Sequence, residues 1–273
     1  FSDKYRSGLF NRELYKDYYK NELAAGRFSF GMEWLIRLFR FFRAFKIWTL
    51  TPRAKSILDI GSGRGFMLYY LKKIFGFKRV EGTQISPNAV LFSRNILGLT
   101  IHDQDLLDIE FKEPFEVITI WHVLEHVPDP IRYLERMYHL LTPKGKLVIE
   151  VPNFDSWTRP LTGKYWLGLD LDHHLSFFTP DSLTILLERN HFRVHRIHTF
   201  SLEYSTFLSA QSILSLLTKT DQFFFKWLQA PQWKGKALCH LSLFLILLPF
   251  CFLMNLLLYP TRKGEVLLMV AEK

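Results

Sequence analysis

Residues 56–65 read Ser-Ile-Leu-Asp-Ile-Gly-Ser-Gly-Arg-Gly, and this stretch decides the fold. Its first half is mostly apolar and short, as in a buried strand, and three glycines follow at every second position. Glycine has no Cβ, so Gly61, Gly63 and Gly65 let the backbone turn sharply and approach a ligand closely. A strand that runs through such a bend into a helix is how an α/β sheet forms a cleft for a nucleotide-sized ligand.

The pattern around this stretch predicts an α/β sheet. From about residue 56 to residue 200, short apolar runs alternate with longer amphipathic ones, which is typical of βαβ units on a parallel sheet. We expect strands at 56–60, 79–83, 100–102, 115–121, 146–151, 193–200 and 265–271. We expect helices at 65–75, 87–97, 130–141 and 180–190, three of them with proline in the first turn, and the turn at 142–145 to end the third.

Length and composition favour one domain with additions. The chain has 273 residues, 48% of them hydrophobic, which is enough for a core and excludes disorder. Cys239 and Cys251 lie in one apolar run, so a disulfide framework is not expected and a reducing compartment fits. Residues 1–19 lack the apolar run of a secretory signal. We divide the chain into an N-terminal helical segment (1–53), a core (54–202), an apolar helical insertion (203–262) and a last strand of the core (263–273).

The N-terminal segment carries a base at every third position among aromatic residues. These bases are Arg37, Arg40, Arg43 and Lys46, within residues 34–48. On a helix they follow one broad side while the aromatic residues cover the other. Such a helix either docks on the domain with its arginines in water or also rests on a lipid headgroup layer.

The insertion contains a long uncharged run. Residues 237–259 carry no formal charge and are long enough to span a bilayer, but Pro249 argues for a break in the helix. If the chain on both sides belongs to one sheet, both ends lie on the same side of any membrane, which excludes a single crossing. We expect an interfacial or re-entrant helical hairpin or a hydrophobic lid, with 207–217 and 223–228 as companion helices. The alternative is an internal helical subdomain or a dimer interface that never meets lipid.

Further motifs follow the glycine bend in a fixed order. Residues 115–130 read Phe-Glu-Val-Ile-Thr-Ile-Trp-His-Val-Leu-Glu-His-Val-Pro-Asp-Pro, and Leu-Leu-Thr-Pro-Lys-Gly, Pro-Asn and His-His-Leu-Ser-Phe-Phe come later. This order resembles the class I S-adenosylmethionine-dependent methyltransferases, in the group of the ubiquinone-biosynthesis O-methyltransferase. The resemblance covers about residues 55–200 and the last strand, but not the insertion. It implies a Rossmann-like seven-stranded sheet and S-adenosyl-L-methionine as the cofactor.

The resemblance also implies the residues that bind the cofactor. The expected set is Asp59, Gly61, Gly63, Gly65, Gln84, Asp105, Leu106 and Trp121. Gln84 stands where an acid usually binds the ribose hydroxyls, and its amide oxygen can accept one such hydrogen bond. Asp105 and Leu106 follow the third strand, where an acid can reach the adenine. Trp121 ends the fourth strand and can attract a sulfonium through its ring. Glu116, Lys144 and Lys146 are milder departures from the family pattern.

Methyl transfer to a hydroxyl needs a base, and two histidines are candidates. We expect His126 or His174 to accept the proton, although each could instead only hydrogen-bond backbone. Glu125 is expected to pair with backbone donors or a helix start. A divalent metal at Asp170, Asp172, His173 and His174 is not predicted, because the spacing is not that of a metal site.

These observations predict a methyltransferase that acts on an amphipathic or lipid-linked small molecule. We expect the protein to be cytoplasmic and to contact the inner face of a membrane peripherally. O-methylation is implied by the resemblance alone. The alternatives are methylation of a lipid acyl chain or headgroup, as in relatives of cyclopropane synthase, and a non-catalytic scaffold. The net charge of +9 makes RNA methylation a further rival. The bases lie beside apolar faces, however, so nucleic acid is not the expected partner. The oligomeric state is left open.

Overall fold

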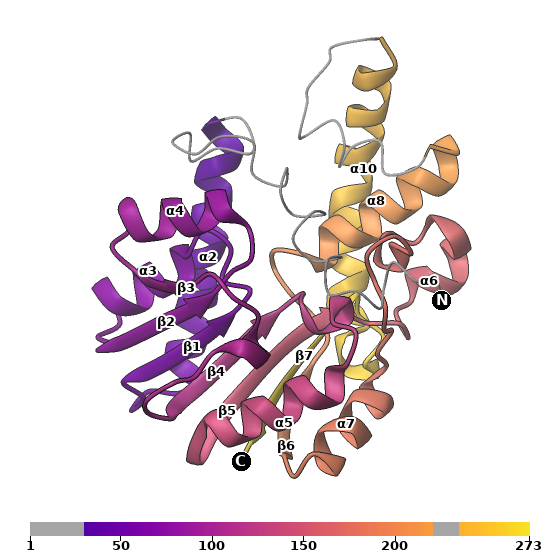
Figure 1. Cartoon of the computed structure of the whole chain (residues 1–273). Coiled ribbons are helices and arrows are strands. Elements are labelled where there is room, and N and C mark those ends of the chain that lie inside the picture. The colour runs from indigo at the N-terminus through magenta and orange to yellow at the C-terminus, as the bar shows by residue number, and fades with distance from the viewer. Residues whose placement is uncertain (1–29, 221–234) are drawn as a thin grey trace.

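The computed structural model describes residues 30–220 and 235–273, which form one seven-stranded sheet with helices on both faces (Figure 1). The strands are β1 (Ser56–Ile60), β2 (Arg79–Thr83), β3 (Thr100–His102), β4 (Phe115–Trp121), β5 (Leu141–Pro152), β6 (Arg193–His198) and β7 (Val266–Glu272), in the order β3-β2-β1-β4-β5-β7-β6. Strand β7 runs antiparallel to β5 and β6, and the other strand pairs are parallel. The expected Rossmann-like class I sheet, with its last strand after the insertion, is confirmed.

The helices follow the predicted punctuation. They are α2 (Phe30–Leu50), α3 (Phe66–Lys73), α4 (Pro87–Asn95), α5 (Pro130–Leu140), α6 (Thr158–Thr162), α7 (Pro180–Arg189), α8 (Ser205–Thr218) and α10 (Gly235–Leu257), with single 3-10 turns η2 (Leu106–Asp108), η3 (Leu124–His126), η4 (Gly163–Tyr165), η5 (Leu167–Leu169) and η6 (Tyr259–Thr261). The predicted turn between α5 and the next strand is wrong, because the strand begins directly after the helix. The turn at 142–145 belongs to β5, where Lys144 has a φ of 65° and the pairing with β4 shifts register.

Two apolar layers hold the sheet, one on each face. Ile57 and Val117 pack with α2, α3 and α4, whereas Leu58 and Ile118 pack with α5 and α7. Successive side chains of a strand point to opposite faces, so a strand buried on both faces is apolar at nearly every position. These two layers fix the central strands, and the candidate site lies at the ends of those strands.

Helix α2 docks on the domain, but two of its arginines do not lie in water as expected. Arg40 and Arg43 face inward: their guanidinium nitrogens lie 2.6 Å and 2.8 Å from Oε2 of Glu203. The aromatic side faces outward, and its exposed side chains are Trp34 (62%), Phe42 (44%), Phe45 (44%) and Trp48 (38%). The expectation of arginines in water is thus wrong for Arg40 and Arg43. The 3.6-residue period defines two sides but does not say which one is buried.

Helix α10 leaves most of its apolar surface exposed. A narrow stripe that includes Ala237, Phe244 and Cys251 is buried, and part of it packs on α8. Its segment Ala237–Leu257 has a mean hydropathy of 2.4 and is mostly exposed, and by length and composition alone it could span a membrane. The expected break at Pro249 is wrong, because the helix continues through it. Proline removes one backbone hydrogen bond, and the neighbouring bonds keep the helix intact.

Figure 1 shows α2 and α10 rising from the same side of the sheet, each with its N-terminal end farthest from the strands. The companion segment 207–217 is confirmed as helical within α8. The expected companion 223–228 and the first 29 residues of the N-terminal segment lie outside the described residues.

Candidate active site

The glycine bend after β1 has the backbone shape that only glycine adopts without strain. Gly61, Gly63 and Gly65 have φ angles of 70°, 56° and 73°. A Cβ on Gly61 would lie 2.4 Å from Cγ2 of Val123, and one on Gly65 would lie 2.6 Å from a methyl of Leu99. The bend is therefore pressed between the loop that follows β4 and the residue before β3, with no room for a side chain at Gly61 or Gly65.

Asp59 lies beneath this bend rather than on its surface. Its side chain is only 3% exposed, and Oδ1 accepts a hydrogen bond of 2.6 Å from Oγ1 of Thr119 on β4. Burial raises the pKa of Asp59 to about 6, which outweighs the hydrogen bond from Thr119 and the attraction of Arg43. The residue thus joins β1 to β4 directly under the glycines.

Gln84 directly follows β2, and its side chain holds the turn that leads into α4. Its amide oxygen accepts hydrogen bonds of 2.8 Å and 2.9 Å from the backbone N–H groups of Ile85 and Ser86. Both lone pairs of the oxygen are then in use. What Gln84 offers a ligand is its NH₂ group, a donor, instead of the acceptor expected from the sequence.

Asp105 and Leu106 occupy the turn after β3. Asp105 is half-buried, and its carboxylate accepts hydrogen bonds from the backbone N–H of Leu107 and from the hydroxyl of Tyr133. Leu106 is 1% exposed and belongs to the core, so its side chain faces the interior. Asp103 lies closer to the end of β3 and is half-buried, which makes it a second candidate acid at this edge.

Trp121 ends β4 and lies under α2. The guanidinium of Arg43 lies 4.1 Å from the centre of its ring, so one cation is already in place there. Its ring nitrogen Nε1 is buried and has no hydrogen-bond partner among the described residues, and the same holds for Nη1 of Arg64 in the bend. Buried donors without a partner are costly, so both fit a ligand that brings hydrogen-bond acceptors.

His122 joins the loop after β4 to β5 through a buried charge network. Its ring nitrogens lie 3.4 Å from Glu125 and 3.2 Å from Glu150, its ring lies 4.2 Å from that of Tyr204, and its φ is 52°. Burial opposes a charge on His122, but the two carboxylates outweigh it and raise its pKa to about 9. A non-glycine residue in this conformation stores strain that the surrounding contacts must offset.

The two candidate bases lie side by side. The ring centres of His126 and His174 are 4.7 Å apart, and each Nδ1 lies within hydrogen-bond distance of a backbone carbonyl, that of His173 at 3.0 Å and that of Gly168 at 2.9 Å. A carbonyl only accepts, so each Nδ1 carries the proton and each Nε2 has the lone pair that a base needs. Burial lowers the pKa of His174 and keeps the ring neutral near pH 7.

Glu125 completes this group. The ligand atoms of Glu125, His126 and His174 lie within 4.8 Å of one another, an arrangement that could hold a metal ion. This set differs from the one considered in the sequence, where His173 instead pairs with Asp170 at 2.9 Å. The expectation that the Glu125 carboxylate pairs with backbone donors is wrong: it faces histidines, and they lower its pKa although burial would raise it.

Four participants were missed from the sequence: His122, Glu150, Arg43 and Glu203. A charged residue inside the apolar run 146–151 was a signal for Glu150. The three-residue spacing of the bases was a signal for Arg43, although it did not indicate an inward orientation. For Glu203, which lies 160 positions from its partner, the sequence holds no local signal.

Comparisons with known proteins agree with this geometry. A family model described as a methyltransferase domain matches residues 33–197. The chain is 28% identical over 148 residues to the ubiquinone biosynthesis O-methyltransferase of Coxiella burnetii. This match covers 50% of this chain and 62% of that protein. It is 35% identical over 113 residues to the EEF1A lysine methyltransferase 2 of Homo sapiens, and this match covers 39% of this chain and 44% of that protein. The chain thus spans less than two thirds of the length of either relative.

Solved structures share the fold at low identity. A putative sarcosine dimethylglycine methyltransferase from Galdieria sulphuraria matches with a TM-score of 0.57 and 14% identity, covering 87% of this chain and 86% of that one. An S-adenosylmethionine-dependent methyltransferase from Archaeoglobus fulgidus matches with a TM-score of 0.53 and 20% identity, covering 86% and 94%. At these identities the likeness concerns the fold.

Proposed function

This chain belongs to the methyltransferase domain family, and from this premise we propose that it transfers a methyl group from S-adenosyl-L-methionine to a hydroxyl of an amphipathic small molecule. The observation that carries the proposal is the contact between the glycine bend and the loop after β4. Val123 touches Gly61, and His126 follows three residues later, so the cofactor bend and the candidate bases belong to one packed unit.

The residues at the strand ends fit the cofactor. The glycine bend gives the adenosyl group a close approach to backbone, the NH₂ of Gln84 can donate to a ribose oxygen, and the free Nε1 donor of Trp121 suits a carboxylate. Asp103 or Asp105 would face the adenine. S-adenosyl-L-methionine, when bound, supplies a methyl group on a positively charged sulfur, so the leaving group needs no protonation.

The two histidines fit the role of base. The acceptor hydroxyl must lose its proton as its oxygen forms a bond to the methyl carbon, and Nε2 of His126 or His174 has the lone pair that can take it. The fixed Nδ1 hydrogen bonds keep both rings oriented, which reduces the entropy that is lost on reaching the transition state.

The exposed apolar surfaces support an amphipathic acceptor. Exposed patches of this extent mark partner or membrane contacts, and α10 and the outer side of α2 both present one. We place the protein at the inner face of a membrane, in peripheral contact from the cytoplasm. The relative named a ubiquinone biosynthesis O-methyltransferase is consistent with such an acceptor. The relative named a lysine methyltransferase makes a protein acceptor the outcome to test against.

Calorimetry with S-adenosyl-L-homocysteine tests the cofactor site. The wild type is expected to bind it, and Gly63→Arg is expected to abolish binding because a long side chain would enter the cleft. Incubation with tritiated S-adenosyl-L-methionine and a membrane extract then tests the acceptor. Label in the lipid fraction supports the proposal, label in protein favours the alternative, and absence of both binding and label rejects it.

A further inference from the structure

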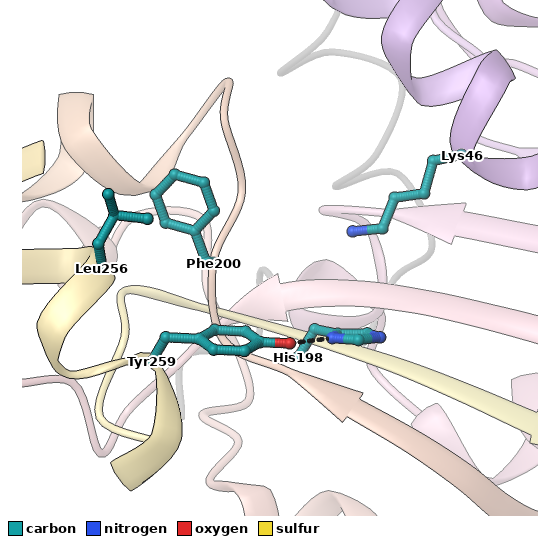
Figure 2. Close-up of a pocket in the computed structure, with 5 residues that line it drawn as sticks. All are labelled: Lys46, His198, Phe200, Leu256 and Tyr259. Carbon is teal, nitrogen blue, oxygen red and sulfur yellow. Dashed lines mark hydrogen bonds between the residues drawn. The ribbon is translucent and has the colours of Figure 1, made fainter.

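A pocket separate from the candidate active site lies between α2 and the end of α10. It has a volume of about 320 Å³ and is lined by Lys46, His198, Phe200, Leu256 and Tyr259 (Figure 2). These residues come from α2, the end of β6 and the segment after it, α10 and η6. Its volume falls at the lower end of the range for small-molecule pockets, which is about 300–1,000 Å³.

One wall of the pocket is polar and cationic. Figure 2 shows the amine of Lys46 pointing away from α2 into the space that the other four side chains border. Among the described residues this amine has no hydrogen bond and no carboxylate within 4.0 Å. The acid that acts on it most is Glu150, which is buried and already paired with His122 and Arg43. Burial lowers the pKa of Lys46, so a negatively charged ligand in the pocket would stabilise the charged form of this amine.

His198 and Tyr259 add a second polar group opposite Lys46. Nδ1 of His198 and the hydroxyl of Tyr259 share a hydrogen bond of 2.5 Å, and their rings are stacked with centres 6.1 Å apart. When Nδ1 accepts from the hydroxyl, Nε2 carries the proton and can donate to a ligand. An ammonium and an imidazole N–H that face one space are the groups that recognise a phosphate or a carboxylate.

The other wall is apolar and continues outside the pocket. Leu256 is 44% exposed and Tyr259 is 40% exposed, and Phe200 contacts Phe252 with ring centres 6.0 Å apart. From there the exposed side chains of α10 extend away from the sheet, among them Leu253, Phe250, Ile246 and Leu245. An apolar chain that leaves the pocket would thus find a continuous apolar surface along the helix.

We propose that this pocket binds the acidic headgroup of an amphipathic molecule, with Lys46 as the ion-pair partner and the tail lying along α10. The residues involved are not those proposed for methyl transfer, so the inference does not depend on that activity. The neutral alternative, a zwitterionic lipid, would place its own cation beside Lys46. Inorganic phosphate alone would leave the apolar wall without a partner.

Calorimetry with short-chain lipids below their micellar concentration tests the proposal on the full chain. Dioctanoyl phosphatidic acid is expected to bind at least tenfold more tightly than dioctanoyl phosphatidylcholine and than inorganic phosphate. Lys46→Gln is expected to weaken binding of the phosphatidic acid about tenfold, the usual effect of losing one charge-assisted hydrogen bond. Lys46→Arg is expected to retain binding, since it keeps the charge.

Lys73→Gln is the matched control, because it removes one charge from an exposed position on α3. Equal weakening by Lys73→Gln and Lys46→Gln would show a general charge effect and overturn the proposal. So would inorganic phosphate that binds as tightly as the lipid. Melting curves establish that the variants are folded, and binding of S-adenosyl-L-homocysteine, measured in parallel, reports separately on the proposed cofactor site.

Discussion

The guanidinium of Arg43 stacks on the ring of Trp121 at 4.1 Å, and its Nη2 lies 2.8 Å from Glu203. A single side chain of α2 thereby links the end of β4 to the start of the insertion. Both charged side chains are largely buried, at 10% and 14% exposure. Removing one partner of a buried ion pair destabilises the folded protein, because the remaining buried charge loses its compensation. This link can therefore be tested by mutation.

Arg43→Gln is expected to lower the free energy of unfolding by about 2 kcal/mol, because Glu203 keeps only Arg40, and Glu150 only His122, as a charged partner. Arg37→Gln on the same helix is the control. Arg37 is exposed, so its loss should cost less than about 1 kcal/mol. Urea unfolding measures both, and equal losses would contradict the buried network.

Gly61→Ala tests the close packing at the glycine bend. Its Cβ would meet Val123 at 2.4 Å, so the loop after β4 must move and binding of S-adenosyl-L-homocysteine should fall at least tenfold. Gly76→Ala is matched in backbone conformation, with a φ of 73°, but a Cβ there meets nothing within 4 Å. It should cost only the left-handed strain, about 1–2 kcal/mol of stability, and leave binding unchanged.

Gln84→Glu should tighten cofactor binding. One carboxylate oxygen can keep the two backbone hydrogen bonds that the amide oxygen now accepts, and the second oxygen becomes an acceptor for a ribose hydroxyl. A charge-assisted hydrogen bond exceeds a neutral one by about 1 kcal/mol, which corresponds to about fivefold in the dissociation constant. Asn95→Asp adds the same charge at the exposed end of α4 and should change nothing. Weaker binding by Gln84→Glu would place the ribose elsewhere.

Stability should depend on pH through His122. Its pKa in the folded protein is about 9, above its ordinary value of 6.5. The stabilisation from the charged ring is therefore complete below about pH 6.5 and is lost as the pH rises to 9, on the order of 3 kcal/mol in all.

The measurement is urea unfolding of the wild type and His122→Gln between pH 6 and 9.5. The difference between the two free energies should shrink as the pH rises. His191→Gln is the control, since His191 also has a positive φ, of 67°, but is exposed. A difference between wild type and His122→Gln that stays constant over this range would show that His122 is not charged in the folded protein.

Membrane contact should depend on the outer side of α10. Ile246 is 70% exposed, and Ile246→Glu should reduce flotation with anionic vesicles about tenfold, the effect of losing one buried apolar side chain at the interface. Ile185→Glu on α7 starts from a side chain that is 50% exposed and should float like the wild type. Wild-type protein that does not float at all would refute the membrane placement.

Much of the architecture was predictable because its signals are local. Buried parallel strands need apolar residues at most positions, so the strands at 56–60 and 115–121 were located to the residue. Proline in a first helical turn, and the capping box between Thr179 and Ser182, fix helix starts in the same local way. The pairing of His126 with His174 was anticipated only as two separate candidates.

The amino-acid sequence by itself determined the sheet, the glycine bend and the candidate bases, since each depends on the conformational preferences of neighbouring residues. The tertiary structure alone decided that Arg40 and Arg43 of α2 face inward, that Glu150 and Glu125 hold His122 charged, and that Lys46 and Tyr259 share a pocket. These contacts join residues far apart in the chain. Their geometry follows from which surfaces pack together, and no local pattern encodes that choice.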